Sequence, residues 1–91
     1  MYLLIAYDIE DTRKRTKLAA LLEQYGERVN YSVFELDIHR QMLDRLLSKI
    51  EALSDKRDSV RIYRFTKETI SHSFELLDGP EPFQKESGYV D

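Results

Sequence analysis

Tyr2-Leu3-Leu4-Ile5-Ala6-Tyr7-Asp8, at the start of the chain, is a run of six apolar or aromatic residues that ends at an aspartate. Such a run is typical of a strand that is buried on both faces in the middle of a sheet. It is far shorter than the roughly 20 residues of a membrane-spanning helix, and it lacks the basic flank of a signal peptide. We therefore expect a cytoplasmic protein without a membrane partner, built around this strand.

Two amphipathic helices are predicted from apolar residues at helical spacing. The two stripes consist of Leu18, Leu21, Leu22 and Tyr25, and of Leu43, Leu46, Leu47 and Ile50. Asp11 is a favoured N-cap residue type, and Gly26 is typical of a helix C-cap. The spacing predicts helices over about residues 12–25 and 40–53.

Other segments have the composition of strands. Residues 28–38 alternate between apolar and polar, but the phase flips at Phe34, which indicates a bulge or sharp bend in one long strand. Residues 59–65 are rich in β-branched and aromatic side chains, which favours a strand. Residues 71–77 are predicted to form a further strand before the turn signal Gly79-Pro80.

Split at its bend, the long strand supplies two ladder segments, and the element order becomes β-α-β-β-α-β. We therefore predict an α+β protein with a ferredoxin-like sandwich, in which a four-stranded antiparallel sheet carries both helices on one face. A dimer would cover the other face. We place the domain at residues 1–78 and a C-terminal tail at 79–91, which supplies a strand or tail that pairs with the partner chain.

The charge is unevenly distributed along the 91 residues. The formal net charge is −3, from 14 basic and 17 acidic residues, and there is no cysteine for a disulfide or a thiolate metal site. Residues 75–91 hold five acids and one base, whereas residues 1–74 hold 12 acids and 13 bases. The acidity of the chain therefore does not exclude a nucleic-acid partner. The alternative interpretation is a solvated charged surface.

Asp8 is the candidate metal ligand, because a carboxylate at the end of a strand can bind Mg²⁺. The alternative is an Asx-turn or capping role. The first turn of the following helix carries three basic residues: Arg13, Lys14 and Arg15. A helix N-terminus disfavours positive charge unless an anion docks there, so the pattern suggests phosphodiester chemistry. The alternative is that Glu10 and Asp11 pair with these bases.

Two arginines and several tyrosines have less specific interpretations. Arg61 and Arg64 either contact phosphates or coat an edge strand. We interpret the tyrosines as core or interface residues rather than as base-stacking platforms; they are Tyr2, Tyr7, Tyr25, Tyr31 and Tyr63.

Taken in order and spacing, five segments of residues 1–65 resemble the CRISPR-associated protein 2 family. The segments are Tyr7-Asp8-Ile9, Arg15 with Lys17, Tyr25-Gly26-Glu27-Arg28-Val29, Ser32-Val33-Phe34-Glu35 and Asp58-Ser59-Val60-Arg61-Ile62-Tyr63. Two features depart from the family pattern. Asn30 stands where the family often has glutamine, and residues 66–91 match no specific motif.

The resemblance implies a homodimer in which Asp8 faces its symmetry mate and one divalent ion, Mg²⁺ or Mn²⁺, bridges the two carboxylates. It implies four catalytic residues: Asp8, Tyr7, Arg15 and Phe34. Tyr7 and Phe34 would position the reacting groups, whereas Arg15 and Arg28 would bind phosphate. Combined with the basic clusters, the predicted nucleic-acid-binding set is Arg13, Lys14, Arg15, Lys17, Arg28, Arg61 and Arg64.

The function that the resemblance implies is a role in spacer acquisition, the adaptation stage of CRISPR antiviral defence. The homodimer would bind RNA or DNA and would act as a metal-dependent endonuclease on single-stranded RNA or double-stranded DNA. The alternative is a non-catalytic dimeric scaffold that bridges integrase subunits and holds protospacer DNA. In both cases the CRISPR integrase subunit is an expected partner.

Overall fold

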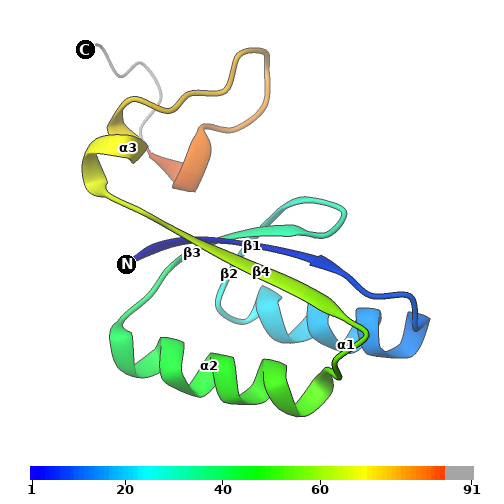
Figure 1. Cartoon of the computed structure of the whole chain (residues 1–91). Coiled ribbons are helices and arrows are strands. Elements are labelled where there is room, and N and C mark those ends of the chain that lie inside the picture. The colour runs from blue at the N-terminus through cyan, green and yellow to red at the C-terminus, as the bar shows by residue number, and fades with distance from the viewer. Residues whose placement is uncertain (86–91) are drawn as a thin grey trace.

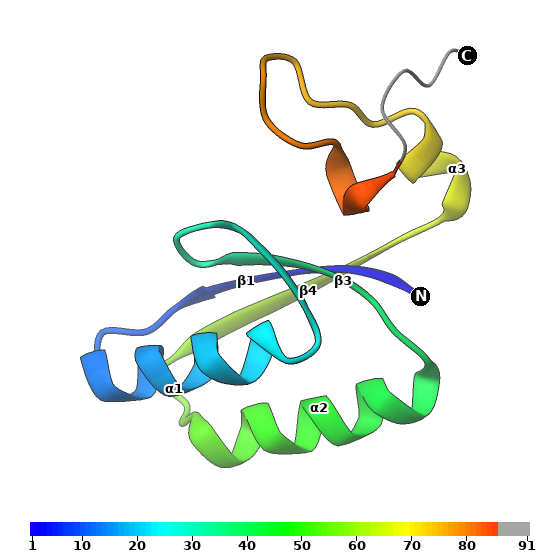
Figure 2. The ribbon, with the colours of Figure 1, turned by 180° about the vertical axis from the view of Figure 1, so that it is seen from behind.

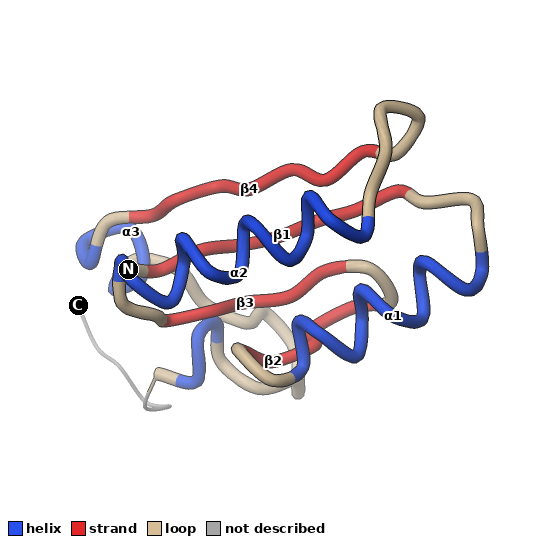
Figure 3. Tube along the Cα trace, turned by 90° about the horizontal axis from the view of Figure 1, so that it is seen from below, coloured by secondary structure: helices blue, strands red, loops and turns tan. Residues whose placement is uncertain are grey.

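The computed structural model describes residues 1–85 of the chain. Its four strands form one antiparallel sheet in the order β2-β3-β1-β4, and α1 and α2 lie on the same side of that sheet (Figures 1 and 3). This arrangement confirms the predicted α+β, ferredoxin-like fold. The elements are β1 (Tyr2–Asp8), α1 (Thr12–Glu23), β2 (Gly26–Asn30), β3 (Val33–Asp37), α2 (Arg40–Leu53), β4 (Ser59–Phe65), the short helix α3 (Lys67–Ser71) and the 3-10 turn η1 (Pro82–Gln84).

β1 is a central strand, paired with β3 on one side and β4 on the other. Its residues Leu3, Ile5 and Tyr7 are buried beneath the helices, whereas Leu4 and Ala6 on the opposite face are only half-buried. In the single chain, β1 is therefore fully buried only on the face beneath the helices, and not on both faces as predicted.

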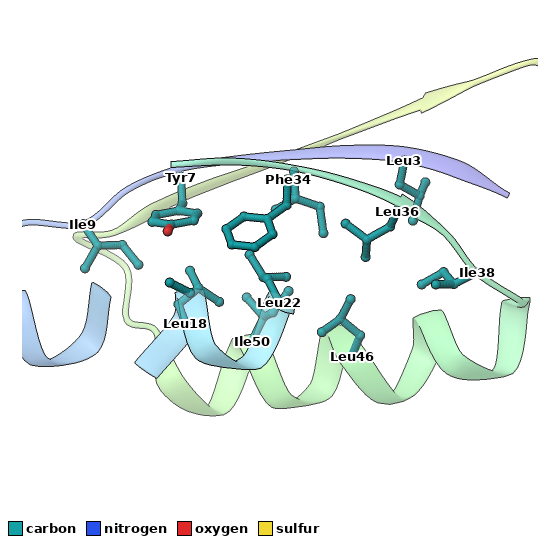
Figure 4. Packing of buried hydrophobic residues seen from close by; sticks show 12 residues of the cluster. Leu3, Tyr7, Ile9, Leu18, Leu22, Phe34, Leu36, Ile38, Leu46 and Ile50 are labelled. Carbon is teal, nitrogen blue, oxygen red and sulfur yellow. The ribbon is translucent and has the colours of Figure 1, made fainter. Parts of the chain in front are cut away.

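The core lies between the sheet and the two long helices (Figure 4). Phe34 of β3 is fully buried and points toward Leu22 of α1, and Leu46 and Ile50 of α2 close the core from below. The leucines that predicted the helices therefore supply much of the surface that holds them to the sheet.

The predicted long strand over residues 28–38 is a hairpin, and the chain turns at Tyr31 and Ser32, before the predicted bend at Phe34. Side chains close this turn. The Asn30 Oδ1 accepts the Tyr31 N–H at 2.7 Å, and the Arg28 guanidinium donates to the Tyr31 carbonyl at 2.6 and 3.0 Å. The phase flip in the sequence marks this turn.

Gly26 begins β2 and is not the C-cap of α1, which ends at Glu23. A Cβ at Gly26 would lie 2.3 Å from the carbonyl oxygen of Glu35 and 2.8 Å from a side-chain carbon of Leu36. Glycine is therefore required here because the backbones of β2 and β3 approach closely.

The predicted strand over residues 71–77 is wrong. Ser71 ends α3, and residues 72–77 are irregular. The Thr66 side chain caps α3 by accepting the Thr69 N–H at 3.1 Å, while buried Ile70 anchors the helix. Three large apolar side chains that follow α3 are exposed and do not belong to a strand: Phe74, Leu76 and Leu77.

The chain then returns over the sheet face that the long helices leave open (Figures 1 and 2). Phe83 of η1 packs edge-to-face against Tyr2 and Phe65, with ring centroids 5.6 and 6.0 Å apart. Its N–H donates to the Glu35 carboxylate at 2.8 Å. The described part of the predicted tail thus contacts its own chain, and residues 86–91 of the tail lie outside the described residues. Within residues 1–85, no helix is long and apolar enough to cross a membrane.

Candidate metal and nucleic-acid site

Asp8 ends β1 and stands opposite Ser59, the first residue of β4. Its side chain is exposed, and none of the hydrogen bonds or ion pairs found within residues 1–85 involves its carboxylate. It borders an open cavity of about 460 Å³, lined by Asp8, Glu10, Asp11, Lys14, Arg57, Asp58 and Ser59. The Asp8 carboxylate is therefore free to bind a ligand from solution.

The surroundings of Asp8 fit a divalent cation only in part. Within the part of the chain that the structure describes, no three or more His, Cys, Asp or Glu side chains are grouped to hold a metal ion. Mg²⁺ is commonly held by one or two protein carboxylates together with water molecules. Of the acidic residues that line the cavity, Asp8 is the one predicted to bind the ion, and Asp11 and Asp58 already accept hydrogen bonds from their own chain.

The N-terminus of α1 already has an anionic partner from its own chain. Asp11 is the N-cap, and its carboxylate accepts the Lys14 N–H at 3.0 Å. This hydrogen bond is the main reason that the pKa of Asp11 lies below its usual value. A phosphate at this helix end would have to share the first-turn amides with Asp11.

Lys14 joins α1 to the loop between α2 and β4. Its ammonium group lies 2.5 Å from an oxygen of Asp55 and 3.3 Å from an oxygen of Asp58. These two carboxylates raise the pKa of Lys14. The pKa of Asp55 lies well below its usual range, mainly because of the Arg57 guanidinium and, to a smaller extent, because of Lys14. The acidic partners of Lys14 thus come from this loop rather than from the expected Glu10 and Asp11.

Arg15 holds the loop that follows Asp8. Its guanidinium donates to the carbonyls of Ile9 and Glu10 at 2.8 and 3.1 Å, and to the Thr12 hydroxyl at 3.2 Å. Because this loop connects β1 to α1, Arg15 fixes the backbone immediately after the candidate metal ligand. The structure therefore gives Arg15 a positioning contact in addition to its predicted phosphate contact.

Tyr7 and Phe34, predicted to position the reacting groups, belong to the core. Their rings stack with centroids 6.3 Å apart and an angle of 26° between the planes. The Tyr7 hydroxyl is buried and makes no hydrogen bond of good geometry within the described residues. Burial raises the pKa of Tyr7, and the Arg28 guanidinium opposes that rise through its charge and its polar contact with the hydroxyl, with a smaller effect from the charge of Arg15.

Arg28 projects from β2 toward the helix side of the sheet. Besides its bonds to the Tyr31 carbonyl, it lies 3.6 Å from the Glu23 carboxylate. Its guanidinium carbon is 5.4 Å from the centroid of the Tyr31 ring and 5.7 Å from that of Phe34. Arg28 thus connects the exposed turn of the hairpin to the core.

The remaining predicted phosphate contacts do not form one surface. Arg13 and Lys17 are exposed on α1. Arg61 pairs with Ala6 on the open face of the sheet, where it donates to the Tyr63 hydroxyl at 3.3 Å. Arg64 pairs with buried Leu3 and so lies on the helix side. One polyanion on one face of this chain would therefore contact Arg61 or Arg64, but not both.

Comparison with known proteins agrees with this fold. The family model described as CRISPR associated protein Cas2 matches residues 1–72. The chain belongs to the Cas2 family. The CRISPR-associated endoribonuclease Cas2 of Thermus thermophilus is 40% identical over 77 residues, which span 84% of this chain and 82% of that protein. This membership confirms the resemblance inferred from the five segments.

Solved structures share this fold. A hypothetical protein of Thermus thermophilus superposes with a TM-score of 0.75 at 40% identity, covering 89% of this chain and 95% of that one. A chain of a partial Cas6-RT-Cas1–Cas2 complex superposes with a TM-score of 0.69 at 34% identity, covering 82% and 89%. The match to the Cas2 family model ends before the segment that packs on the open sheet face.

The sequence did not point to Tyr31 as a surface residue. Tyr31 is 69% exposed at the tip of the hairpin, so it is not a core residue, and its interpretation as an interface residue stays a prediction. The available signal was its position between two strands of opposite apolar phase, where a turn residue projects from the sheet.

Proposed function

We propose that this chain is a divalent-metal-dependent endoribonuclease that acts on single-stranded RNA and takes part in CRISPR adaptation. The observation that carries the proposal is the exposed, unpaired carboxylate of Asp8 at the end of the central strand. The endoribonuclease name of a relative at 40% identity supports catalysis over the non-catalytic scaffold.

In this proposal, Asp8 from each of two chains would hold one Mg²⁺ or Mn²⁺ ion. Two carboxylates brought close together repel each other, and a cation between them relieves the repulsion. When bound, the ion supplies Lewis-acid chemistry to the phosphate and lowers the pKa of its water. The chain itself fixes Asp8 through the pairing of β1 with both neighbouring strands, while Arg15 holds the loop behind it.

A homodimer is part of the proposal. The open face of the sheet carries half-buried Leu4 and Ala6 beside Tyr63, whose side chain is 44% exposed. A second copy on this face would remove these apolar groups from water. We also propose the Cas1 integrase as a partner, because a similar chain occurs in a complex whose components include Cas1 and Cas2.

The test is cleavage of an end-labelled single-stranded RNA with Mg²⁺, with Mn²⁺ and with a chelator. We expect Asp8→Asn to lower the cleavage rate by about 100-fold or more, because even the loss of an outer-shell partner of a metal typically costs 10- to 100-fold. Glu10→Gln is the matched control, since Glu10 lines the same cavity, and should cleave like the wild type.

Equal cleavage by Asp8→Asn and the wild type, or full activity in the chelator, would contradict the proposal. Duplex DNA is included as a second substrate. Metal-dependent cleavage of the duplex alone would keep the catalytic role of Asp8 and replace RNA as the substrate.

A further inference from the structure

Tyr31 is an aromatic side chain that the hairpin presents to solvent on a fixed backbone. The residue is 69% exposed. Its N–H is bound by the Asn30 side chain at 2.7 Å, and its carbonyl accepts two bonds from the Arg28 guanidinium. Because both backbone polar groups are held, the backbone that carries the ring loses little freedom when a ligand binds.

A groove with two arginines lies beside this ring, between α1 and the hairpin turn. Its volume is about 420 Å³, and it is lined by Thr12, Arg15, Thr16, Ala19, Ala20, Glu23, Arg28 and Tyr31. An arginine side chain carries five N–H donors. Two of those of Arg28 go to the Tyr31 carbonyl, and a third nitrogen faces Glu23 at 3.6 Å. Arg28 therefore retains donors for a further acceptor.

The groove and the cavity around Asp8 are separate, and their lining residues are neighbours along the first turn of α1. Thr12 and Arg15 line the groove, and the neighbouring residues Asp11 and Lys14 line the cavity. A ligand that extends from Tyr31 along the groove would pass Arg15.

We propose that this groove binds one unpaired nucleotide of a single-stranded nucleic acid, with the base stacked on Tyr31 and the adjacent phosphate at Arg28. Base stacking on an exposed aromatic ring combined with a guanidinium for phosphate is the usual chemistry of single-strand recognition. A duplex does not fit this site, because its bases are already stacked on one another. The inference deepens the proposed function, on which it rests for the identity of the substrate, and it is an alternative to the interpretation of Tyr31 as an interface residue.

The test measures binding without cleavage. A fluorescent oligouridylate of about ten nucleotides, and an abasic oligomer of the same length, are titrated with protein in chelator while fluorescence anisotropy is recorded. Oligouridylate is chosen because its bases stack weakly on one another. The variants are Tyr31→Ala, Tyr31→Phe and the control Phe74→Ala, since Phe74 is 68% exposed elsewhere on the surface.

We expect Tyr31→Ala to weaken oligouridylate binding about 5-fold or more, as expected for the loss of one stacked base. Tyr31→Phe and Phe74→Ala should bind like the wild type, and the abasic oligomer should bind wild type and Tyr31→Ala equally. Three results would overturn the inference: no binding of oligouridylate by the wild type, no effect of Tyr31→Ala, or equal weakening with the abasic oligomer.

Sedimentation of the same variants gives a further criterion. If Tyr31→Ala changes the oligomeric state, the ring is a protein contact and the inference is wrong. A wild type that shows Tyr31-dependent binding but never cleaves RNA would contradict the proposed function alone.

Discussion

At the scale of single residues, removing the Tyr7 hydroxyl tests whether Tyr7 has a structural role or the predicted catalytic role. The hydroxyl is buried and makes no hydrogen bond of good geometry in the described chain, and an unsatisfied buried hydroxyl destabilises the folded state. We expect Tyr7→Phe to keep or raise the free energy of unfolding, by up to about 1 kcal/mol, in urea denaturation. RNA cleavage by this variant should equal that of the wild type.

The opposite outcome for Tyr7→Phe would have a clear meaning. A loss of cleavage at unchanged stability would show that the hydroxyl reaches the substrate, as the predicted catalytic role requires. A loss of more than about 1 kcal/mol of stability would show that the hydroxyl has a hydrogen-bond partner in the assembled protein.

Residue identity alone distinguishes some of these roles. Asp8 could be predicted as an accessible carboxylate, because it is the charged residue at which the apolar run of residues 2–7 ends. Tyr7 lies two positions after Ile5 on β1 and so shares its face of the sheet, and Phe34 pairs with Ile5. Strand alternation therefore accounts for the burial of both rings. The partners of Lys14 could not be predicted, because Asp55 and Asp58 are more than 40 positions away in the chain.

At the scale of elements, the Lys14 ion pairs connect α1 to the loop that leads into β4. We expect Lys14→Met to lower the melting temperature at pH 7 by a few degrees. Lys17→Met is the matched control, because Lys17 is exposed on the same helix, and it should melt like the wild type. Differential scanning calorimetry checks both variants.

The pH dependence of the Lys14 variant follows from the lowered pKa of Asp55, caused by Arg57 and Lys14. A carboxylate with a lowered pKa in the folded state contributes stability above its usual value of 3.8, and loses that contribution as pH falls through the lower folded value. The difference between Lys14→Met and the wild type should therefore shrink below about pH 4. A difference that is equally large at pH 2 would contradict an ionic origin.

Elements differ in how well the sequence predicts them. The sequence predicts α2 at its observed bounds, because four apolar residues at helical spacing are a stronger signal than the strand or loop preferences of the same segment. The hairpin turn was misplaced because Asn30 and Arg28 close it through side-chain bonds, without glycine or proline. The strand expected at residues 71–77 failed because the Thr66 cap and buried Ile70 favour a helical turn instead.

At the scale of the whole molecule, one chain holds only half of the proposed metal site. Asp8 is a single carboxylate, and the open face of the sheet is partly covered by Phe83 of the same chain. The fold class followed from the order of elements alone, whereas the path of residues 72–85 over the sheet could not be predicted, because it depends on ring contacts between β1, β4 and η1.

The central claim is that Asp8 from two chains holds one divalent ion. The most direct measurement is a Mn²⁺ titration, in which electron paramagnetic resonance reports the free ion at known chain concentration. We predict one tightly bound Mn²⁺ per two chains for the wild type and none for Asp8→Asn, with Glu10→Gln unchanged. Binding of one ion per chain, or equal binding by Asp8→Asn, would contradict the account.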